Sequence, residues 1–575
     1  MRRSLLALFC VSAAAVPLLA QAQQDSLANL IEAGNRKAAL EKIRAGADVN
    51  QAQPDGTTPV HWAVYHVDYD VLAALLARKA NVNVTNQFGS APLAEAVEVA
   101  DARLVKMLLD AGAKPEAANQ DGETALMLAI KTGDLPIVEM LINVGAKVNT
   151  IEKFHNQTPL MWAAAAPKNA AEIVKLLLAK GADVKPRALY TDWPSQISSE
   201  PRAQYRPVGG LTALLYAARD GCYACVEELL AAGDDMNRPT PEGITPLMIA
   251  LDNDHNDVAK LLLDRGANPK LWDWWGRTAL YIAIDRKEAA VGGGRGGAGG
   301  GRGGNVRGRG GASPVAAESG PAVSSMEMIE VLLAKNVDVN PQLNMHRPSR
   351  GGNSGRFIEN LRSTGCTPLL RATEGGDIEV ARLLLDKGAD PNINTMGLTP
   401  FLLAAGVGPG NRGGTGLAAQ GSAGGAVSTA LMDSLLQHGA DINARVTGTL
   451  TYSMRVSRAP SANEGMSALH VAAQAGKLDL VRYLLDHGAN ANITNDEGKK
   501  PIDLVATSAP RGGGATRGAE ATVNITAGAN PPAAAGGAPA AAGRGGAGRG
   551  RGPAAPSAET LTEIRTLLEN AAGKK

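Results

Sequence analysis

The chain repeats itself with a period of 33 residues. A Thr-Pro-Leu-like tripeptide begins at Thr212 and again at Thr245, and a glycine follows each of them 21 residues later, at Gly233 and Gly266. The same spacing joins Thr58 to Lys79, Ala91 to Gly112, Thr124 to Gly145, Thr367 to Gly388 and Ser467 to Gly488. Self-similarity at this period is typical of a solenoid, in which each unit contacts only its neighbours. The fold therefore follows from one unit and the way it stacks.

One unit predicts two short helices. Thr245 is a good N-cap, and Pro246 fits the first helical position because its missing N–H would have no partner there. A second apolar helix runs through residues 258–263, and Gly266 can end it in the left-handed conformation. Two such helices cannot bury their apolar faces alone, so we expect the units to stack.

The motifs Thr58-Pro59-Val60-His61, Ser467–Ala473 and Gly488–Asn492 resemble the ankyrin repeat family. The resemblance implies an all-α ankyrin-repeat solenoid with short β-hairpin connectors. It also implies that His61 and His470 hydrogen-bond within and between repeats. We expect about twelve helix-turn-helix units, beginning near Asp25, Thr58, Ala91, Thr124, Thr158, Thr212, Thr245, Thr278, Thr367, Thr399, Ser467 and Lys500.

Residues 1–22 have the pattern of a secretory signal peptide, although a first buried helix would also be apolar. Arg2 and Arg3 supply the positive charge, an apolar stretch follows, and Ala20-Gln21-Ala22 predicts cleavage after Ala22. The protein is then periplasmic or secreted. No later stretch is long and apolar enough to span a membrane.

The charge of the mature chain is close to zero. Losing Arg2 and Arg3 from 57 basic residues leaves 55 against 56 acidic residues. Such a balance exerts no general attraction on nucleic acid or anionic membrane, so we expect neither as a partner.

Departures from the period divide the chain. The predicted organisation is a signal peptide at 1–22, repeats at 23–287 with a connector insert at 185–210, a Gly/Arg-rich insert at 288–325, repeats at 326–506 with inserts at 341–365, 406–427 and 445–465, a Gly/Ala/Arg-rich insert at 507–558, and a capping helix at 559–575. The glycine-rich inserts are expected to be disordered because they cannot bury enough apolar surface. An Arg-Gly nucleic-acid binder is the alternative, but stretches 292–313 and 510–558 contain no aromatic residue.

The inserts between repeats have a different composition, since they carry aromatic and basic residues. The resemblance implies that connectors and inner helices form a concave binding face, which would place these inserts on it as long fingers. The connector tip Trp272-Asp273-Trp274 is a further candidate because polar residues are usual there. The candidate partner-binding residues are Trp272, Asp273, Trp274, Tyr190, Trp193, Tyr205, Arg206, Phe357, Tyr452 and Arg455. Alternatively, these side chains pack on neighbouring repeats and stiffen the solenoid.

Cys222 and Cys225 form a Cys-x-x-Cys pair at the start of a second helix. Three interpretations stay open: a local disulfide, buried free thiols, or a redox pair, although a thioredoxin-like site needs a βαβ setting. Cys366 is the third cysteine after signal cleavage. The eight histidines do not cluster, and no nucleophile, phosphate-loop or zinc-protease motif occurs. We therefore expect no catalysis, no cofactor and no metal.

Together these patterns predict an exported, non-catalytic, monomeric scaffold that binds a protein or peptide on its concave face. Two alternatives stay open. One is a structural or assembly spacer of the cell envelope. The other is a redox or small-molecule accessory protein that uses Cys222 and Cys225.

Overall fold

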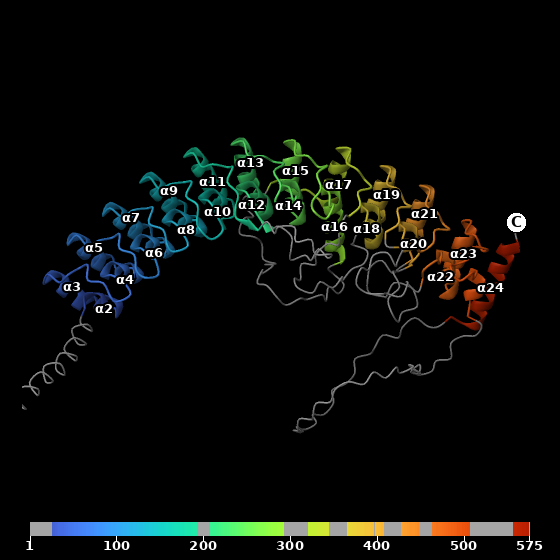
Figure 1. The fold of residues 1–575 in the computed structure, drawn as a ribbon, viewed down its shortest axis with the longest axis horizontal. Coiled ribbons are helices and arrows are strands. Elements are labelled where there is room, and N and C mark those ends of the chain that lie inside the picture. The colour runs from blue at the N-terminus through green and yellow to red at the C-terminus, as the bar shows by residue number, and fades with distance from the viewer. Residues whose placement is uncertain are drawn as a thin grey trace, which may run out of the picture. The chain divides into compact units, whose positions relative to one another are not determined.

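The helices follow one another in antiparallel pairs in the computed structural model of the chain (Figure 1). The structure describes residues 26–191, 208–292, 320–343, 365–395, 397–407, 427–447, 463–506 and 556–573. The predicted all-α solenoid is confirmed within these ranges. The signal peptide and most of each predicted insert lie outside them.

The chain divides into two compact units, Met1–Ala389 and Asp390–Lys575. The first contains α2 (Leu27–Glu32), α3 (Arg36–Arg44), α4 (Pro59–Tyr65), α5 (Tyr69–Ala77), α6 (Pro92–Glu98), α7 (Ala102–Asp110), α8 (Ala125–Thr132), α9 (Leu135–Asn143), α10 (Pro159–Ala164), α11 (Ala170–Ala179), β1 (Tyr190–Thr191), β2 (Val208–Gly209), α12 (Ala213–Asp220), α13 (Tyr223–Ala231), α14 (Pro246–Asp252), α15 (Asn256–Asp264), α16 (Ala279–Gly292), α17 (Ser325–Ala334), α18 (Pro368–Gly375) and α19 (Ile378–Asp386). The second contains α20 (Pro400–Ala404), α21 (Thr429–Gln437), α22 (Ala468–Gln474), α23 (Leu478–Asp486), the 3₁₀ helix η3 (Pro501–Leu504) and α24 (Ala558–Gly573).

In the first unit, the first helices of successive pairs form one layer and the second helices form the other (Figure 1). For example, α4 packs on both α2 and α6, and α5 packs on α3. The buried residues between them are small or aliphatic, such as Leu72, Leu75 and Leu104. Each repeat thus completes the core of its neighbour, as expected of a solenoid.

Local signals set the ends of the helices as predicted. The Thr245 hydroxyl accepts a hydrogen bond from the Met248 N–H at 3.3 Å, with Pro246 in the first turn. Gly266 follows α15 with a φ of +100°, a conformation that glycine adopts without steric cost. Lys79 occupies the equivalent position in an earlier repeat with a φ of 60°, so the left-handed turn persists there despite a side chain.

Two histidines connect neighbouring repeats. His61 Nδ1 lies 2.7 Å from the Thr58 hydroxyl, and His61 Nε2 lies 3.2 Å from the Ser90 carbonyl of the next repeat. His470 makes the same contacts to Ser467 and Lys499. The predicted structural role of both side chains is confirmed, and burial lowers the pKa of each imidazole.

Asparagine side chains make a second set of links. Asn83 donates to the Gly112 carbonyl at 3.0 Å and accepts from the Lys114 N–H at 2.8 Å. Asn149 makes the same two contacts with Gly181 and Asp183. Each amide therefore satisfies a carbonyl at the end of the next repeat's second helix, where no helical N–H is available.

The three connector inserts leave the repeats through the same backbone arrangement, here called the clasp. Leu343 N–H donates to Cys366 at 3.2 Å, and Gly365 N–H donates back to Leu343 at 2.7 Å. Val446 pairs with Met466 and Gly465 in the same way. The root of the first insert has a related pair of bonds, from the Ala188 N–H to Leu211 and from the Gly210 N–H to Leu189, and continues as the antiparallel strands β1 and β2. The other described connectors are tight turns with at most an isolated bridge, so the predicted β-hairpins are shorter than expected.

One predicted boundary is wrong. The Gly/Arg-rich insert was expected to begin at residue 288, but α16 continues to Gly292. The helix continues because Asp285, Arg286 and Lys287 form ion pairs with neighbouring repeats, as described below.

Candidate partner-binding surface on the connector turns

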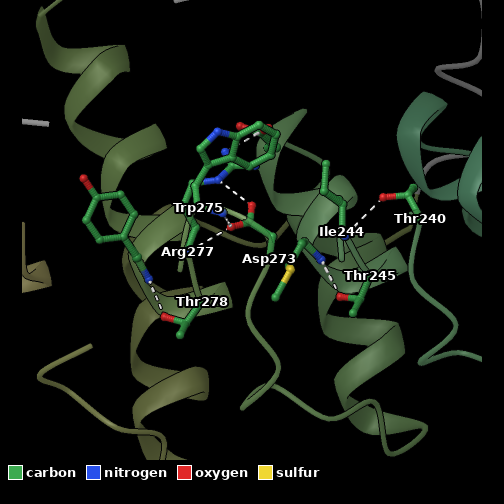
Figure 2. A network of polar contacts seen from close by, with 10 residues as sticks. Thr240, Ile244, Thr245, Asp273, Trp275, Arg277 and Thr278 are labelled. Atoms are coloured by element: carbon green, nitrogen blue, oxygen red, sulfur yellow. Dashed lines mark hydrogen bonds and ion pairs between the residues drawn. The ribbon is translucent and has the colours of Figure 1, made fainter. Parts of the chain in front are cut away.

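The connector turns share one hydrogen-bond pattern, which Figure 2 shows for two successive repeats. In the turn before α16, Asp273 Oδ1 accepts from the Trp275 N–H at 3.0 Å and from the Arg277 N–H at 2.9 Å. Asn86, Asn119 and Asn495 use their side-chain oxygens in the same way in other turns. An acceptor at this position closes the turn, whatever its charge.

Two indoles project from the turn before α16. Trp272 is 63% exposed and Trp274 is 46% exposed, whereas Trp275 in the same turn is buried. In two earlier repeats the positions equivalent to Trp272 and Trp274 hold Thr85 with Gln87, and Ala118 with Gln120. At these two positions the turn presents large aromatic side chains where those two repeats present small or polar ones, while Phe88 and Phe154 are exposed at a different position of their turns.

Asp273 does not share this exposure. The sequence grouped it with the two tryptophans as a partner-binding residue, but its side chain is buried, with only 1% exposed. The carboxylate points back into the turn because two backbone N–H groups and Arg277 bind it there. Asp273 supports the surface and does not lie on it.

Arg277 links the turn to helix α14 through two ion pairs. Its Nε lies 2.7 Å from Asp273 Oδ2, and its Nη1 lies 3.3 Å from Asp252 at the end of α14. Its guanidinium also lies 5.2 Å from the centre of the Trp275 ring. Burial alone would lower the pKa of Arg277, but the two carboxylates outweigh it and raise that pKa. Burial raises the pKa of Asp273, while Arg277 opposes that shift.

The turn is also fixed to the preceding one. The Trp274 N–H donates to the Glu242 carbonyl at 2.8 Å. A β-carbon on Gly243 would come within 3.1 Å of the Asp273 α-carbon, so the two backbones are in close contact. The two exposed indoles therefore extend from a rigid base, which lowers the entropy lost when a partner binds.

A shallow pocket adjoins Trp272. It has a volume of about 190 Å³ and lies between this turn and the connector that follows α17. Its lining combines aromatic, aliphatic, polar and charged groups: Lys270, Trp272, Gly276, Thr278, Asp338, Pro341 and Gln342.

The remaining predicted partner-binding residues are only partly within the described chain. Tyr190 lies in β1 at the root of the first connector insert and is 47% exposed. The others lie outside the described residues: Trp193, Tyr205, Arg206, Phe357, Tyr452 and Arg455. Arg277 is a functional candidate that the sequence analysis missed. The sequence signal that could have identified it is its position four residues after Asp273, a spacing that allows an ion pair across the turn.

The cysteines are placed for stability. Cys222 and Cys225 form a disulfide at the start of α13, and both are buried. Cys366 is a buried free thiol that accepts a hydrogen bond from the Tyr281 hydroxyl at 3.7 Å, and burial raises its pKa to about 12. A buried disulfide and a protonated buried thiol are poorly suited to redox exchange.

The described ranges contain neither a metal-binding cluster nor a membrane-spanning helix. No group of three or more His, Cys, Asp or Glu side chains there is arranged to hold a metal ion. No helix in the same ranges combines the length and the apolar character that crossing a bilayer requires.

Comparison with known proteins agrees with the repeat architecture. The family model "Ankyrin repeats (3 copies)" matches residues 27–119, 93–188 and 203–291. The model "Ankyrin repeats (many copies)" matches 435–505, and the model "Ankyrin repeat" matches 364–396.

Individual relatives match over shorter stretches. Ankyrin repeat and SOCS box protein 9 of Mus musculus is 35% identical over 95 residues, 14% of this chain and 33% of that protein. The mitochondrial disaggregase of Homo sapiens is 33% identical over 193 residues, 33% of this chain and 24% of that protein. Alpha-latrocrustotoxin-Lt1a of Latrodectus tredecimguttatus is 26% identical over 180 residues, 31% of this chain and 9% of the toxin.

This chain thus spans a third or less of the length of each of these relatives. What they share with it is the repeat, and ankyrin repeats are generally non-catalytic modules for protein–protein interaction. The matched segments together cover more than half of the sequence. The chain belongs to the ankyrin repeat family.

Proposed function

We propose that this protein is an exported, non-catalytic scaffold that binds a protein or peptide partner on its connector turns. The observation that carries the proposal is the pair of exposed indoles, Trp272 and Trp274, on a turn fixed by Arg277. Tryptophan is enriched among the residues that dominate binding energy at protein interfaces. Two exposed indoles two residues apart form a larger apolar patch than a single exposed ring, and such patches mark interaction sites.

The partner lies across several connectors on the concave face. The pocket beside Trp272 extends the surface toward Pro341 and Gln342 of the next described connector. Tyr190 adds an exposed aromatic ring at the root of the first connector insert. Recognition uses a preformed surface, and no covalent step is required.

Two features support export. Residues 1–22 have the charge, apolar stretch and Ala-x-Ala site of a signal peptide. The Cys222–Cys225 disulfide is a bond that persists in oxidising compartments. Mass spectrometry of the protein purified from the periplasm or the medium should give a chain that begins at Gln23. An intact Met1 there would contradict this part of the proposal.

The binding test begins with affinity capture from the organism's own envelope extract, with the mature chain as bait. The captured partner is then purified and titrated against the parent protein and against Trp272→Ala and Trp274→Ala. If the indoles are central contacts, each variant should bind about 1–2 kcal/mol more weakly, roughly 5- to 30-fold in Kd.

Phe154→Ala is the matched control. Phe154 is 67% exposed on the connector turn of another repeat, so its removal tests the loss of any exposed aromatic ring. Its Kd should equal that of the parent. Equal affinity for the parent and both tryptophan variants would place the partner elsewhere on the repeats.

A further inference from the structure

Helix α16 carries an unusual buried charge cluster at the junction with α18. Arg371 of α18 is 2% exposed, and its Nε lies 2.8 Å from Asp285 of α16. Its Nη1 lies 3.3 Å from Glu374. Next to this group, Lys287 of α16 forms an ion pair with Asp377, the N-cap residue of α19. Two cations thus serve three carboxylates.

Glu288 is a fourth carboxyl group in the same cluster. Its side chain is 5% exposed, and its Oε1 has no hydrogen-bond partner. Within the described chain it makes no ion pair of its own. A methyl group on Gly375 would overlap its other oxygen, so the carboxyl is pressed against the end of α18. The backbone angles at position 375 are open to any residue, so the close approach of Glu288 is the reason that a side chain does not fit there.

The surroundings favour a neutral Glu288. The carboxylate of Asp377 faces Glu288 and would accept a hydrogen bond from the protonated Glu288 carboxyl. The nearby cations Arg371 and Lys287 already form ion pairs with other carboxylates. Glu374 and Asp285 add negative charge. The buried residues of α17, which also packs on α16, are apolar. On the α14 side, Asp252 faces Arg277 and Asp254 pairs with Arg286.

We propose that Glu288 is a proton-operated latch: the C-terminal half of α16 stays docked on α18 when this carboxyl carries a proton, and loosens when the carboxyl ionises. The junction is the point where the first helix of this repeat ends, before the Gly/Arg-rich insert. The latch is independent of the partner-binding proposal, because none of its residues belongs to the turn around Trp272.

The direction of the effect follows from the environment. Burial and the charge of Asp377 raise the pKa of Glu288 from 4.5 to about 7, although Arg371 opposes the shift. Once the helix end opens, the carboxyl returns to its ordinary range near 4.5. Between these values the docked state binds more protons than the open state, so docking is strongest below pH 4.5 and weakens as pH rises through 7. From pH 5.5 to 8.5, local opening should increase about 30-fold.

Hydrogen–deuterium exchange with mass spectrometry on the intact protein tests this. Protection of peptides from α16 and α18, corrected for the intrinsic pH dependence of exchange, should fall about 30-fold between pH 5.5 and 8.5. Peptides from α8 provide an internal reference and should not change. A flat profile for α16 in the parent protein would overturn the proposal without any variant.

Three substitutions, one of them a control, assign the effect. Glu288→Gln fixes the neutral state and should remove the pH dependence, while Glu330→Gln on the exposed side of α17 should keep the parental profile. Asp377→Asn removes a charge that favours protonation, so it should reduce the pH dependence if Glu288→Gln does not fold. A parental profile in Glu288→Gln would assign the effect to another group and refute the latch.

Discussion

The two turns drawn in Figure 2, at residues 240–245 and 273–278, have the same backbone but different interiors. In each, the N–H of the first residue donates to a carbonyl four residues later, and the glycine at the fourth position donates back. Thr240 completes its turn with a hydroxyl that accepts from the Ile244 N–H at 3.2 Å. Asp273 does so with a carboxylate.

The difference shows what a charge adds to a turn that does not need one. Burying the Asp273 carboxylate costs more free energy than burying a hydroxyl, and the ion pair with Arg277 offsets that cost. Arg277 in turn connects the turn to Asp252 of α14 and to the Trp275 ring. The second turn is therefore tied to more of its surroundings, and it is the turn that carries the exposed indoles.

Among the substitutions that test the difference between the two turns, Arg277→Met should have the largest effect on stability. It leaves Asp273 buried without its cation, so the free energy of unfolding should fall by about 3–5 kcal/mol. The measurement is urea unfolding followed by circular dichroism. Arg265→Met removes the exposed ion pair with Glu227 and should change stability by less than about 1 kcal/mol. Similar losses for both variants would show that the buried network adds nothing.

Gly243→Ala tests the contact between the turns. Gly243 has a φ of +82°, and the added β-carbon would lie 3.1 Å from the Asp273 α-carbon. We expect a loss of about 2–3 kcal/mol, because the left-handed backbone and the close contact both oppose a side chain. Gly266 has a φ of +100°, but a β-carbon there would have no atom within 4 Å. Gly266→Ala should therefore lower the free energy of unfolding by only about 1–2 kcal/mol. Equal unfolding midpoints in urea would contradict a role for the contact.

The smallest effect is expected at the neutral turn. Thr240→Ala removes one acceptor and should destabilise the protein by about 1 kcal/mol. Thr240→Asn should restore stability to within about 0.5 kcal/mol of the parent, because Asn119 performs the same role in its own turn. Thermal unfolding of the three proteins side by side would reveal this order. An asparagine variant as unstable as the alanine variant would mean that the hydroxyl has a further partner.

The parts of the fold that repeat were predictable from the sequence. The caps at Thr245, the left-handed glycine at Gly266 and the bridging histidines depend on contacts within one repeat or between adjacent ones, so each copy reinforces the others. The exposure of Trp272 and Trp274 also followed from register. The burial of Asp273 did not, although Asn119 and Thr240 at the equivalent position also accept hydrogen bonds from N–H groups of their own turns.

The charge cluster at α16 lay beyond such reasoning. Asp285 and Arg371 are 86 residues apart along the chain. Other repeats also carry a charged residue at the position of Asp285, such as Arg219 and Asp252, so the sequence pattern does not single out this pair. The composition around residue 288 pointed to a loop, since the glycine-rich run begins soon afterwards. Only the packing of α18 on α16 shows why charged residues extend that helix.

The clasp at the base of the connector inserts has a consequence for protein engineering. At Leu343 with Cys366 and Gly365, and at Val446 with Met466 and Gly465, two backbone hydrogen bonds join the two ends of the connector insert. A foreign loop whose ends fit the same antiparallel pair can replace the native one without altering the core of either flanking repeat. The roots of the connector inserts are thus natural attachment points for grafted recognition loops.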